Sequence, residues 1–199
     1  MPRAEREQLI LEVAGPLFAR EGYHAASMDE IAQLAGVSKP MLYTYFGSKE
    51  GLYVAYIDRT GKKLLERLVR AGRGGEDAAA RLRARISEFL AFVEEYRDGW
   101  TVLFREVSSS GPLALEVAAL RKQIADAVRR MLEAEIGSGS GPPHPATDAI
   151  AHAIVGAGES LANWWLEQPA VGRDEVAAWY VALVHATVAG AFRGASSWR

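Results

Sequence analysis

The sequence predicts an all-α fold of about nine helices. Apolar residues recur at three- and four-residue spacings through most of the 199 residues, which is the period of an amphipathic helix. No segment alternates apolar and polar residues with the period of two that a half-buried strand requires. The length suits a small domain followed by a larger one, and we place their boundary between residues 1–50 and 51–199.

The first helix is expected to end at Gly22. Gly15 and Pro16 interrupt it, because a proline removes one main-chain hydrogen bond and clashes with the carbonyl of residue 12. The sequence predicts a kink or a late start of the helix at this point and leaves open how the pair is accommodated. The apolar residues that define the helix are Ile10, Ala14, Leu17 and Phe18.

The most specific segment starts at Ser27 and is SMDEIAQLAGVSKPMLYTYFGSKEGL. Ser27 and Glu30 form a capping box that begins a short helix, and Gly36 supplies the permissive backbone that ends it. Ser38 caps a second short helix with Pro40 in its first turn, where the missing N–H costs nothing. Two short helices joined by a tight turn are typical of a helix-turn-helix, whose second helix lies in the major groove of DNA.

The rest of the chain continues as helices. Ser48 caps a long fourth helix that runs to about Arg70, and the Gly-rich segment 71–75 separates it from the later helices. The segment 137–145, GSGSGPPHP, is expected to be a flexible connection. The apolar spacing predicts the later helices from Leu82 to Val93, from Trp100 after Gly99 to Val107, from Val117 to Met131, from Thr147 to about Glu167 and from Asp174 to about Arg193.

Composition favours a cytoplasmic protein. The chain has no cysteine, so disulfides and thiolate metal sites are excluded. The charged start MPRAEREQ lacks the apolar core of a secretion signal. Val176 to Phe192 carries no formal charge, but it is rich in alanine and interrupted by His185, Thr187 and Gly190. We therefore expect a buried helix at this position and no membrane span.

The charge balance counts against a nonspecific or architectural DNA binder. The whole chain has a net charge of −2, and the first 50 residues, with five cations and seven carboxylates, also have −2. A nonspecific or architectural DNA binder depends on neutralising many phosphates. A site-specific dimer needs only a few contacts per subunit. Its affinity should depend more on neutral donors such as Ser27, Tyr43 and Tyr45 than on counterion release.

An ordered pattern of residues runs through positions 6–55. Its members are Phe18, Gly22-Tyr23, Ile31-Ala32, Ala35-Gly36-Val37-Ser38, Leu42-Tyr43, Tyr45-Phe46 and Ser48-Lys49-Glu50-Gly51-Leu52. This pattern resembles that of the TetR family of dimeric, ligand-responsive transcriptional repressors. Beyond residue 55 the resemblance is one of architecture only.

The resemblance implies a helix-turn-helix DNA-binding domain at 1–50 and an effector-binding and dimerisation domain, built as a helical bundle, at 51–199. It also implies a homodimeric repressor that binds a palindromic operator of double-stranded DNA and is released by a small-molecule effector. The alternative is a DNA-binding regulator whose larger domain only dimerises or docks a protein. The effector, its charge, the operator, the target genes and the choice between repression and activation are left open.

The DNA contacts are expected on the second helix of the motif and at its edges. Lys39 can reach a guanine edge or a phosphate, and Tyr43 and Tyr45, by resemblance, donate to phosphate oxygens. Lys49 lies at a helix N-terminus, where a phosphate is favoured. Ser27 is a cap first and a phosphate contact second. The expected DNA-binding residues are Ser27, Lys39, Pro40, Met41, Tyr43, Thr44, Tyr45 and Lys49, with a thymine methyl or no base as the partner of Met41 and Thr44.

The last two helices carry small residues at helical spacing. Small side chains let helix axes approach closely, either within one subunit or across a four-helix dimer interface. We favour the dimer interface. The residues are Ala149, Ala153, Gly156, Ser160, Ala178, Ala182, Ala186 and Gly190.

The effector pocket is expected where aromatic residues gather between helices, although such a stripe is also common in a core. Glu159 would favour a cationic ligand and Arg105 an anionic one, while a paired or solvated surface role is equally open for each. The candidate residues are Trp100, Phe104, Arg105, Glu159, Asn163, Trp164 and Trp165.

Catalysis has little support in the sequence. The segment from Gly158 to Ala162 is close to a nucleophile elbow, but its serine lies in the middle of a predicted helix. The four histidines lack metal-ligand spacing, and the glycines at 72–75 are not followed by the Lys-Ser/Thr of a phosphate loop. We expect no enzymatic activity, no metal and no cofactor.

Overall fold

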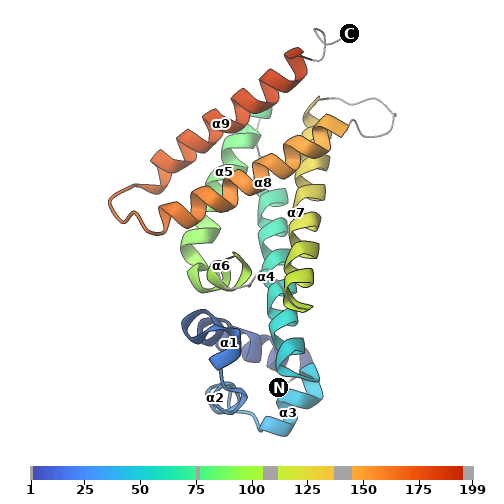
Figure 1. Ribbon diagram of the computed structural model, residues 1–199, viewed down its shortest axis with the longest axis vertical. Coiled ribbons are helices and arrows are strands. Elements are labelled where there is room, and N and C mark those ends of the chain that lie inside the picture. The colour runs from blue at the N-terminus through green and yellow to red at the C-terminus, as the bar shows by residue number, and fades with distance from the viewer. Residues whose placement is uncertain (1, 75–76, 105–111, 137–144, 195–199) are drawn as a thin grey trace. The chain divides into compact units, whose positions relative to one another are not determined.

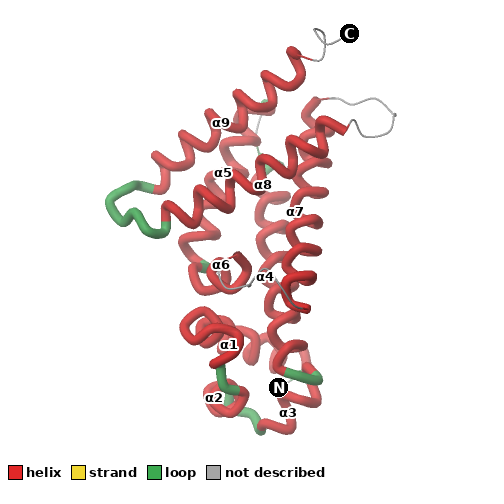
Figure 2. Tube along the Cα trace, in the orientation of Figure 1, coloured by secondary structure: helices red, strands yellow, loops and turns green. Residues whose placement is uncertain are grey.

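The computed structural model describes residues 2–74, 77–104, 112–136 and 145–194. Within these ranges it contains nine helices and no strand, which confirms the all-α prediction (Figures 1 and 2). The helices are α1 (Arg3–Ala25), α2 (Met28–Leu34), α3 (Lys39–Phe46), α4 (Lys49–Ala71), α5 (Ala78–Glu95), α6 (Arg97–Phe104), α7 (Pro112–Ile136), α8 (Pro145–Trp165) and α9 (Arg173–Gly194).

The chain divides into two compact units. The first comprises Met1–Lys63 and Tyr96–Leu120, and the second comprises Leu64–Glu95 and Arg121–Arg199. The division falls within α4 and α7. The functional boundary that we place after residue 50 stays a prediction.

Helix α1 corrects the expectation at Gly15 and Pro16. It begins at Arg3, and its main-chain dihedral angles depart from helical values only at Gly22, with φ 78°. A kink or late start at Pro16 is therefore wrong, whereas the expected break at Gly22 is present. Apolar residues on both sides of the proline are buried, and this burial offsets the lost hydrogen bond. They are Ile10, Leu11, Ala14, Leu17 and Phe18.

Tyrosines of α4 hold the first unit together. The Tyr53 ring lies edge-on to Phe18 of α1, with ring centroids 4.9 Å apart. Its hydroxyl donates to the main-chain oxygen of Val102 in α6 at 3.0 Å. The Tyr53 side chain therefore joins α1, α4 and α6.

Tyr56, one turn later, fills a space between two glycines. A Cβ on Gly15 of α1 would lie 2.4 Å from the Tyr56 ring, and a Cβ on Gly99 would lie 3.0 Å from its hydroxyl oxygen. The sequence places a helix start after Gly99, but α6 starts at Arg97 and buries Gly99 inside it. The missing side chain is what lets α6 approach Tyr56 so closely.

The helix-turn-helix has the serine caps that the sequence predicts, but only half of the capping box, because the Glu30 carboxylate bonds to Arg20 in place of the Ser27 N–H. Ser27 Oγ accepts from the N–H of Glu30, and Ser38 Oγ accepts from the N–H of Met41, both at 3.4 Å. Gly36 has φ 63° and turns the chain between α2 and α3. The Glu30 carboxylate pairs with Arg20 at 3.2 Å.

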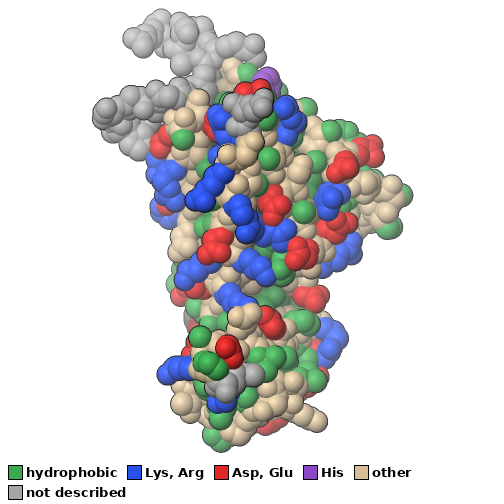
Figure 3. Space-filling model, turned by 180° about the vertical axis from the view of Figure 1, so that it is seen from behind, with side chains coloured by type: hydrophobic (Ala, Val, Ile, Leu, Met, Phe, Trp, Pro, Cys, Tyr) green, Lys and Arg blue, Asp and Glu red, His purple; other side chains and the backbone are tan. Residues whose placement is uncertain are grey.

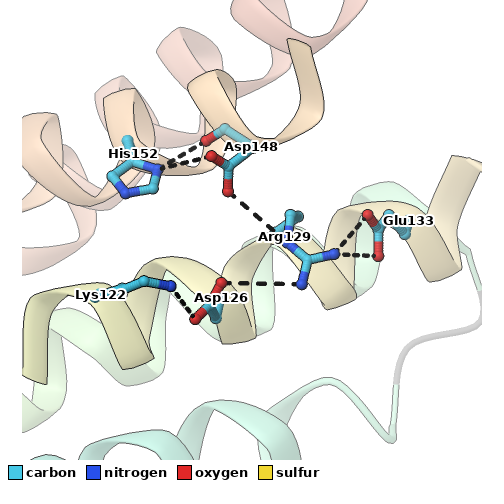
Figure 4. A network of polar contacts seen from close by, with 6 residues as sticks. All are labelled: Lys122, Asp126, Arg129, Glu133, Asp148 and His152. Carbon is cyan, nitrogen blue, oxygen red and sulfur yellow. Dashed lines mark hydrogen bonds and ion pairs between the residues drawn. The ribbon is translucent and has the colours of Figure 1, made fainter. Parts of the chain in front are cut away.

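Ion pairs join the helices of the second unit. Figure 4 shows Arg129 of α7 between Glu133 on its own helix, at 2.8 Å, and Asp148 of α8, at 3.8 Å. Arg81 of α5 pairs with Glu135 of α7 at 2.5 Å. The Tyr180 hydroxyl of α9 donates to the main-chain oxygen of Ile154 in α8 at 2.6 Å. These contacts tie α5, α7, α8 and α9 into one bundle.

Among the helices of the described residues, none has the length and apolar character that crossing a membrane would require.

Candidate functional site

Helix α3 has one side packed against the protein and one side exposed to solvent. Leu42 is fully buried and anchors the helix to the first unit. Lys39, Pro40, Tyr43 and Thr44 are exposed. Six of the eight residues expected at DNA therefore lie on α3, a helix of eight residues, and four of these six are exposed.

Lys39 is paired within the protein. Its ammonium lies 2.8 Å from Oδ2 of Asp29, a residue in the first turn of α2. The hydrogen bond and the charge of Asp29 raise the pKa of Lys39. Lys39 is therefore a firmly charged cation at the start of the recognition helix, and its partner is a carboxylate that no pattern in the sequence selects.

The hydroxyls of α3 differ in their availability. Thr44 Oγ1 donates to the main-chain oxygen of Pro40 at 2.9 Å, so its proton is already used inside the helix. Tyr43 is exposed, and Tyr45 is half-buried. Of these three, Tyr43 is the one best placed to meet DNA.

The start of α1 adds two cations that the sequence alone does not assign to the site. The Arg3 guanidinium carbon lies 5.1 Å from the Tyr45 ring centroid, and Nη1 of Arg6 lies 3.8 Å from the sulfur of Met41. Arg3 and Arg6 lie three positions apart on α1, and this spacing is the feature of the sequence that places them on one side of the helix. We add Arg3 and Arg6 to the candidate DNA-contacting residues.

Lys49 joins the ends of two helices. Its ammonium donates to the main-chain oxygen of His24, near the end of α1, at 2.8 Å, and it lies 5.1 Å from the Tyr23 ring centroid. Burial lowers the pKa of Lys49. The ammonium has three donors, so a phosphate contact is compatible with this link. Ser27, the helix cap, is half-buried.

Charges of both signs are interspersed. Lys and Arg side chains lie among Asp and Glu side chains over the face shown in Figure 3. On this face no broad basic area stands out, in line with the net charge of −2.

The eight small residues expected at a dimer interface are all exposed, four on α8 and four on α9. This exposure is compatible with the expected dimer interface, which stays a prediction. The same two helices also expose large apolar side chains to solvent. Trp164, Trp179 and Leu183 are 42%, 46% and 51% exposed. The Trp164 and Trp179 rings lie 6.3 Å apart. We call the surface formed by these eleven residues the α8–α9 face.

The close approach between α8 and α9 inside the subunit depends on a different small residue. A Cβ on Gly158 would lie 2.7 Å from the hydroxyl oxygen of Tyr180. Gly158 and Ala162 are buried. The small residues of α8 therefore lie on two sides of the helix, one packed against α9 and one exposed to solvent.

The residues expected at an effector pocket fall into two groups. Trp100 is buried in the first unit, with its ring 4.2 Å from that of Phe104. In the second unit Trp165 is buried, and its Nε1 donates to the main-chain oxygen of Val171 at 2.9 Å. Trp164 belongs to the α8–α9 face. Arg105 lies outside the described residues.

Glu159 has a partner in the second unit. Nε of Arg121 in α7 lies 3.1 Å from both carboxylate oxygens. Glu159 is largely buried, and this burial raises its pKa despite the nearby guanidinium. Its charge is matched by Arg121, which favours the paired role over recognition of a cationic ligand. Asn163, one turn later, is half-buried.

Among the described residues, no cluster of three or more His, Cys, Asp or Glu side chains is arranged to hold a metal ion.

Solved structures share this fold, and they include the following three. A TetR-like transcriptional regulator from Rhodococcus sp. RHA1 is 34% identical, with a TM-score of 0.74 and coverage of 96% of this chain and 99% of its own. FadR from Bacillus subtilis in complex with stearoyl-CoA is 20% identical, with a TM-score of 0.76 and coverage of 92% and 98%. AibR in complex with isovaleryl coenzyme A and operator DNA is 20% identical, with a TM-score of 0.67 and coverage of 89% and 97%.

Sequence comparison gives the family. The HTH-type transcriptional activator FasR of Mycolicibacterium smegmatis is 36% identical over 167 residues, which cover 83% of this chain and 74% of FasR. A model described as bacterial regulatory proteins, tetR family, matches residues 10–56. A second, described as tetracyclin repressor-like, C-terminal domain, matches residues 79–189. The chain belongs to the TetR family of transcriptional regulators.

Proposed function

We propose that the protein is a homodimeric transcriptional repressor that binds a palindromic operator through α3 of each subunit and is released by a small-molecule effector. It acts in the cytoplasm and has no catalytic role. The observation that carries the proposal is the exposed side of α3, where Lys39 and Tyr43 face solvent while Leu42 anchors the helix. A rigid helix with a few outward donors is what major-groove recognition requires.

The α8–α9 face supports the homodimer. Exposed tryptophan and leucine side chains beside a stripe of alanine and glycine are costly in water and suit close helix packing. A two-fold axis brings identical faces together, so one self-complementary surface is sufficient. Two copies of α3 then read two half-sites about one helical turn apart or somewhat more.

The effector class is proposed from chemistry and from fold relatives. FadR and AibR are described in complex with acyl-CoA molecules, and both share the fold of this chain. Phe104, whose ring packs beside the buried Trp100 ring, is half-buried and is the aromatic candidate for contact with an apolar group. Acyl-CoA thioesters of graded chain length are therefore the first compounds to test.

Selection from random DNA tests whether the protein recognises a palindromic operator. The purified chain is used to enrich sequences from a random duplex library, and the recovered DNA is measured by fluorescence anisotropy. An inverted repeat is expected. Enrichment of no sequence, or of a single unrepeated half-site, contradicts the proposal.

Effector release is tested on the same DNA. Acyl-CoA thioesters are screened by thermal shift and then added to the protein–operator complex. We expect one class to raise the unfolding temperature and to release the DNA. Operator binding that no compound changes would favour a regulator whose larger domain only dimerises or docks a protein.

A separate assay distinguishes repression from activation, because the relative FasR is named as an activator. The operator is placed upstream of a reporter gene with and without the regulator. Repression predicts less reporter when the protein is present, and more reporter would establish activation.

A further inference from the structure

The cations of the first 50 residues are held by acceptors on the protein itself. Five cations lie in this segment, and four of them have an oxygen partner within 3.2 Å. These contacts join Arg3 to Glu7, Arg20 to Glu21 and Glu30, Lys39 to Asp29, and Lys49 to the main-chain oxygen of His24.

The pair of Lys39 and Asp29 differs from the others in its place in the helix-turn-helix. It joins α2 to α3, and Lys39 is the only cation on either helix. The Lys39 and Asp29 side chains are 45% and 71% exposed. Solvent screens such a pair, so an incoming phosphate or base edge can take the ammonium from the carboxylate.

We propose that Asp29 competes with DNA for Lys39 and thereby limits the affinity of the regulator. The inference rests on the proposed function, in which Lys39 contacts the operator. When the ammonium moves to DNA, the Asp29 carboxylate loses its partner and lies in the field of the phosphates. Both changes oppose binding, so the wild-type complex is weaker than the contacts of Lys39 alone would make it.

The competition has a signature in the salt dependence. A lysine that neutralises a phosphate releases counterions from DNA and makes the affinity fall with salt. If the same lysine leaves a carboxylate, that carboxylate takes up a cation from solution, and the net release is smaller. Removing the carboxylate charge should therefore make binding both tighter and more dependent on salt.

The test compares Asp29→Asn with wild type on the selected operator. We expect the dissociation constant to fall about threefold to tenfold near 0.1 M salt, since each dimer contains two pairs. The slope of log K against log salt concentration should steepen by about one to two. In a Lys39→Ala background, most of this gain should disappear, because the competed group is gone.

Asp58→Asn is the matched control. It removes the same charge from an exposed pair with Lys62, nine residues beyond the start of α4. Its effect on affinity and salt slope should be much smaller than that of Asp29→Asn, since α4 places it about 13 Å along the helix from Lys49 and salt screens it. Unfolding temperatures of all variants are measured to separate folding from binding.

The affinity of Asp29→Asn for the operator supports or overturns the competition between Asp29 and DNA. Asp29→Asn that binds the operator no more tightly than wild type overturns the inference and leaves the proposed function intact. Weaker binding would make Asp29 a DNA-contacting residue, such as an acceptor from cytosine, and would also overturn it. A gain that persists in the Lys39→Ala background would assign the effect to phosphate repulsion alone and overturn the competition. A wild-type chain that selects no operator refutes the proposed function itself.

Discussion

At the scale of single residues, neighbouring positions of α3 differ in burial and therefore in role. Leu42 is fully buried, while Tyr43 beside it is exposed. A substitution at the first position should affect folding, and one at the second should affect DNA binding.

Tyr43→Phe and Lys39→Ala should differ in their effect on sequence preference. Loss of the Tyr43 hydroxyl removes a phosphate contact and should weaken binding about tenfold on every operator variant. Lys39→Ala should weaken the preferred operator more than its base-substituted variants, because a base contact is lost. Anisotropy titrations over a panel of operator variants measure both. Equal loss on all sequences for Lys39→Ala would reduce Lys39 to a phosphate contact.

Lys49→Ala should lower both stability and DNA affinity. The main-chain oxygen of His24 loses its donor and the Tyr23 ring loses its cation. We expect the free energy of unfolding to fall by about 1 kcal/mol in a denaturant titration. Lys49→Gln, which keeps a donor, should recover part of the stability and not the DNA affinity. If Lys49→Ala leaves DNA affinity unchanged, Lys49 serves only to join α1 and α4.

The pKa of Glu159 gives a prediction in pH. Burial raises the folded-state pKa above the unfolded value, so the folded protein binds this proton more tightly than the unfolded chain does. The contribution of Glu159 to stability is therefore present at low pH and is lost as the pH rises from about 4.5 through the folded-state pKa. Glu159→Gln should flatten this part of the profile of unfolding free energy against pH. An unchanged profile would contradict the burial effect.

The sequence predicted the residue types of the candidate site better than their partners. Exposure of Lys39 and Tyr43 follows from helical spacing relative to Leu42. The contact of Lys39 with Asp29, ten positions away, and of Lys49 with His24, 25 positions away, depends on how helices pack and has no local pattern. For the same reason, no local pattern places Arg3 beside Tyr45.

At the scale of elements, local signals located the helix ends well. Ser27, Ser38 and Ser48 all accept the main-chain N–H bonds expected of caps, and Gly36 and Gly47 turn the chain with positive φ. Where the sequence misled, at Pro16 and Gly99, a local rule was outweighed by packing. Burial on both sides carries α1 through Pro16, and Gly99 lies inside α6 because Tyr56 occupies the space that a side chain would need.

The fit of Tyr56 between α1 and α6 predicts a coupled pair of substitutions. Gly15→Ala places a methyl group 2.4 Å from the Tyr56 ring and should cost about 1–3 kcal/mol of unfolding free energy. In a Tyr56→Ala background the same substitution should be nearly neutral, because the ring is absent. Denaturant titrations of the four proteins measure the coupling. Equal costs of Gly15→Ala in both backgrounds would show that Tyr56 does not constrain α1.

At the scale of the whole molecule, the proposed repressor depends on the α8–α9 face. Its members are eight small residues and three large apolar ones, and all eleven are exposed in the single chain. The sequence pattern indicated the small residues but not Trp179 and Leu183, whose exposure depends on how α9 packs against the bundle. A single subunit presents one recognition helix, so specific recognition of an inverted repeat depends on pairing two copies.

Ala182→Glu tests that pairing, because it places a carboxylate in the exposed stripe of α9 without changing the subunit core. Sedimentation velocity at micromolar concentration should give twice the chain mass for wild type and the chain mass for Ala182→Glu. Operator affinity of the variant should fall more than about 100-fold, while Leu115→Glu, at an apolar residue of α7 that is 73% exposed, should remain dimeric and bind normally. A monomeric wild-type chain, or an Ala182→Glu variant that stays dimeric and holds the operator, would contradict the proposed pairing.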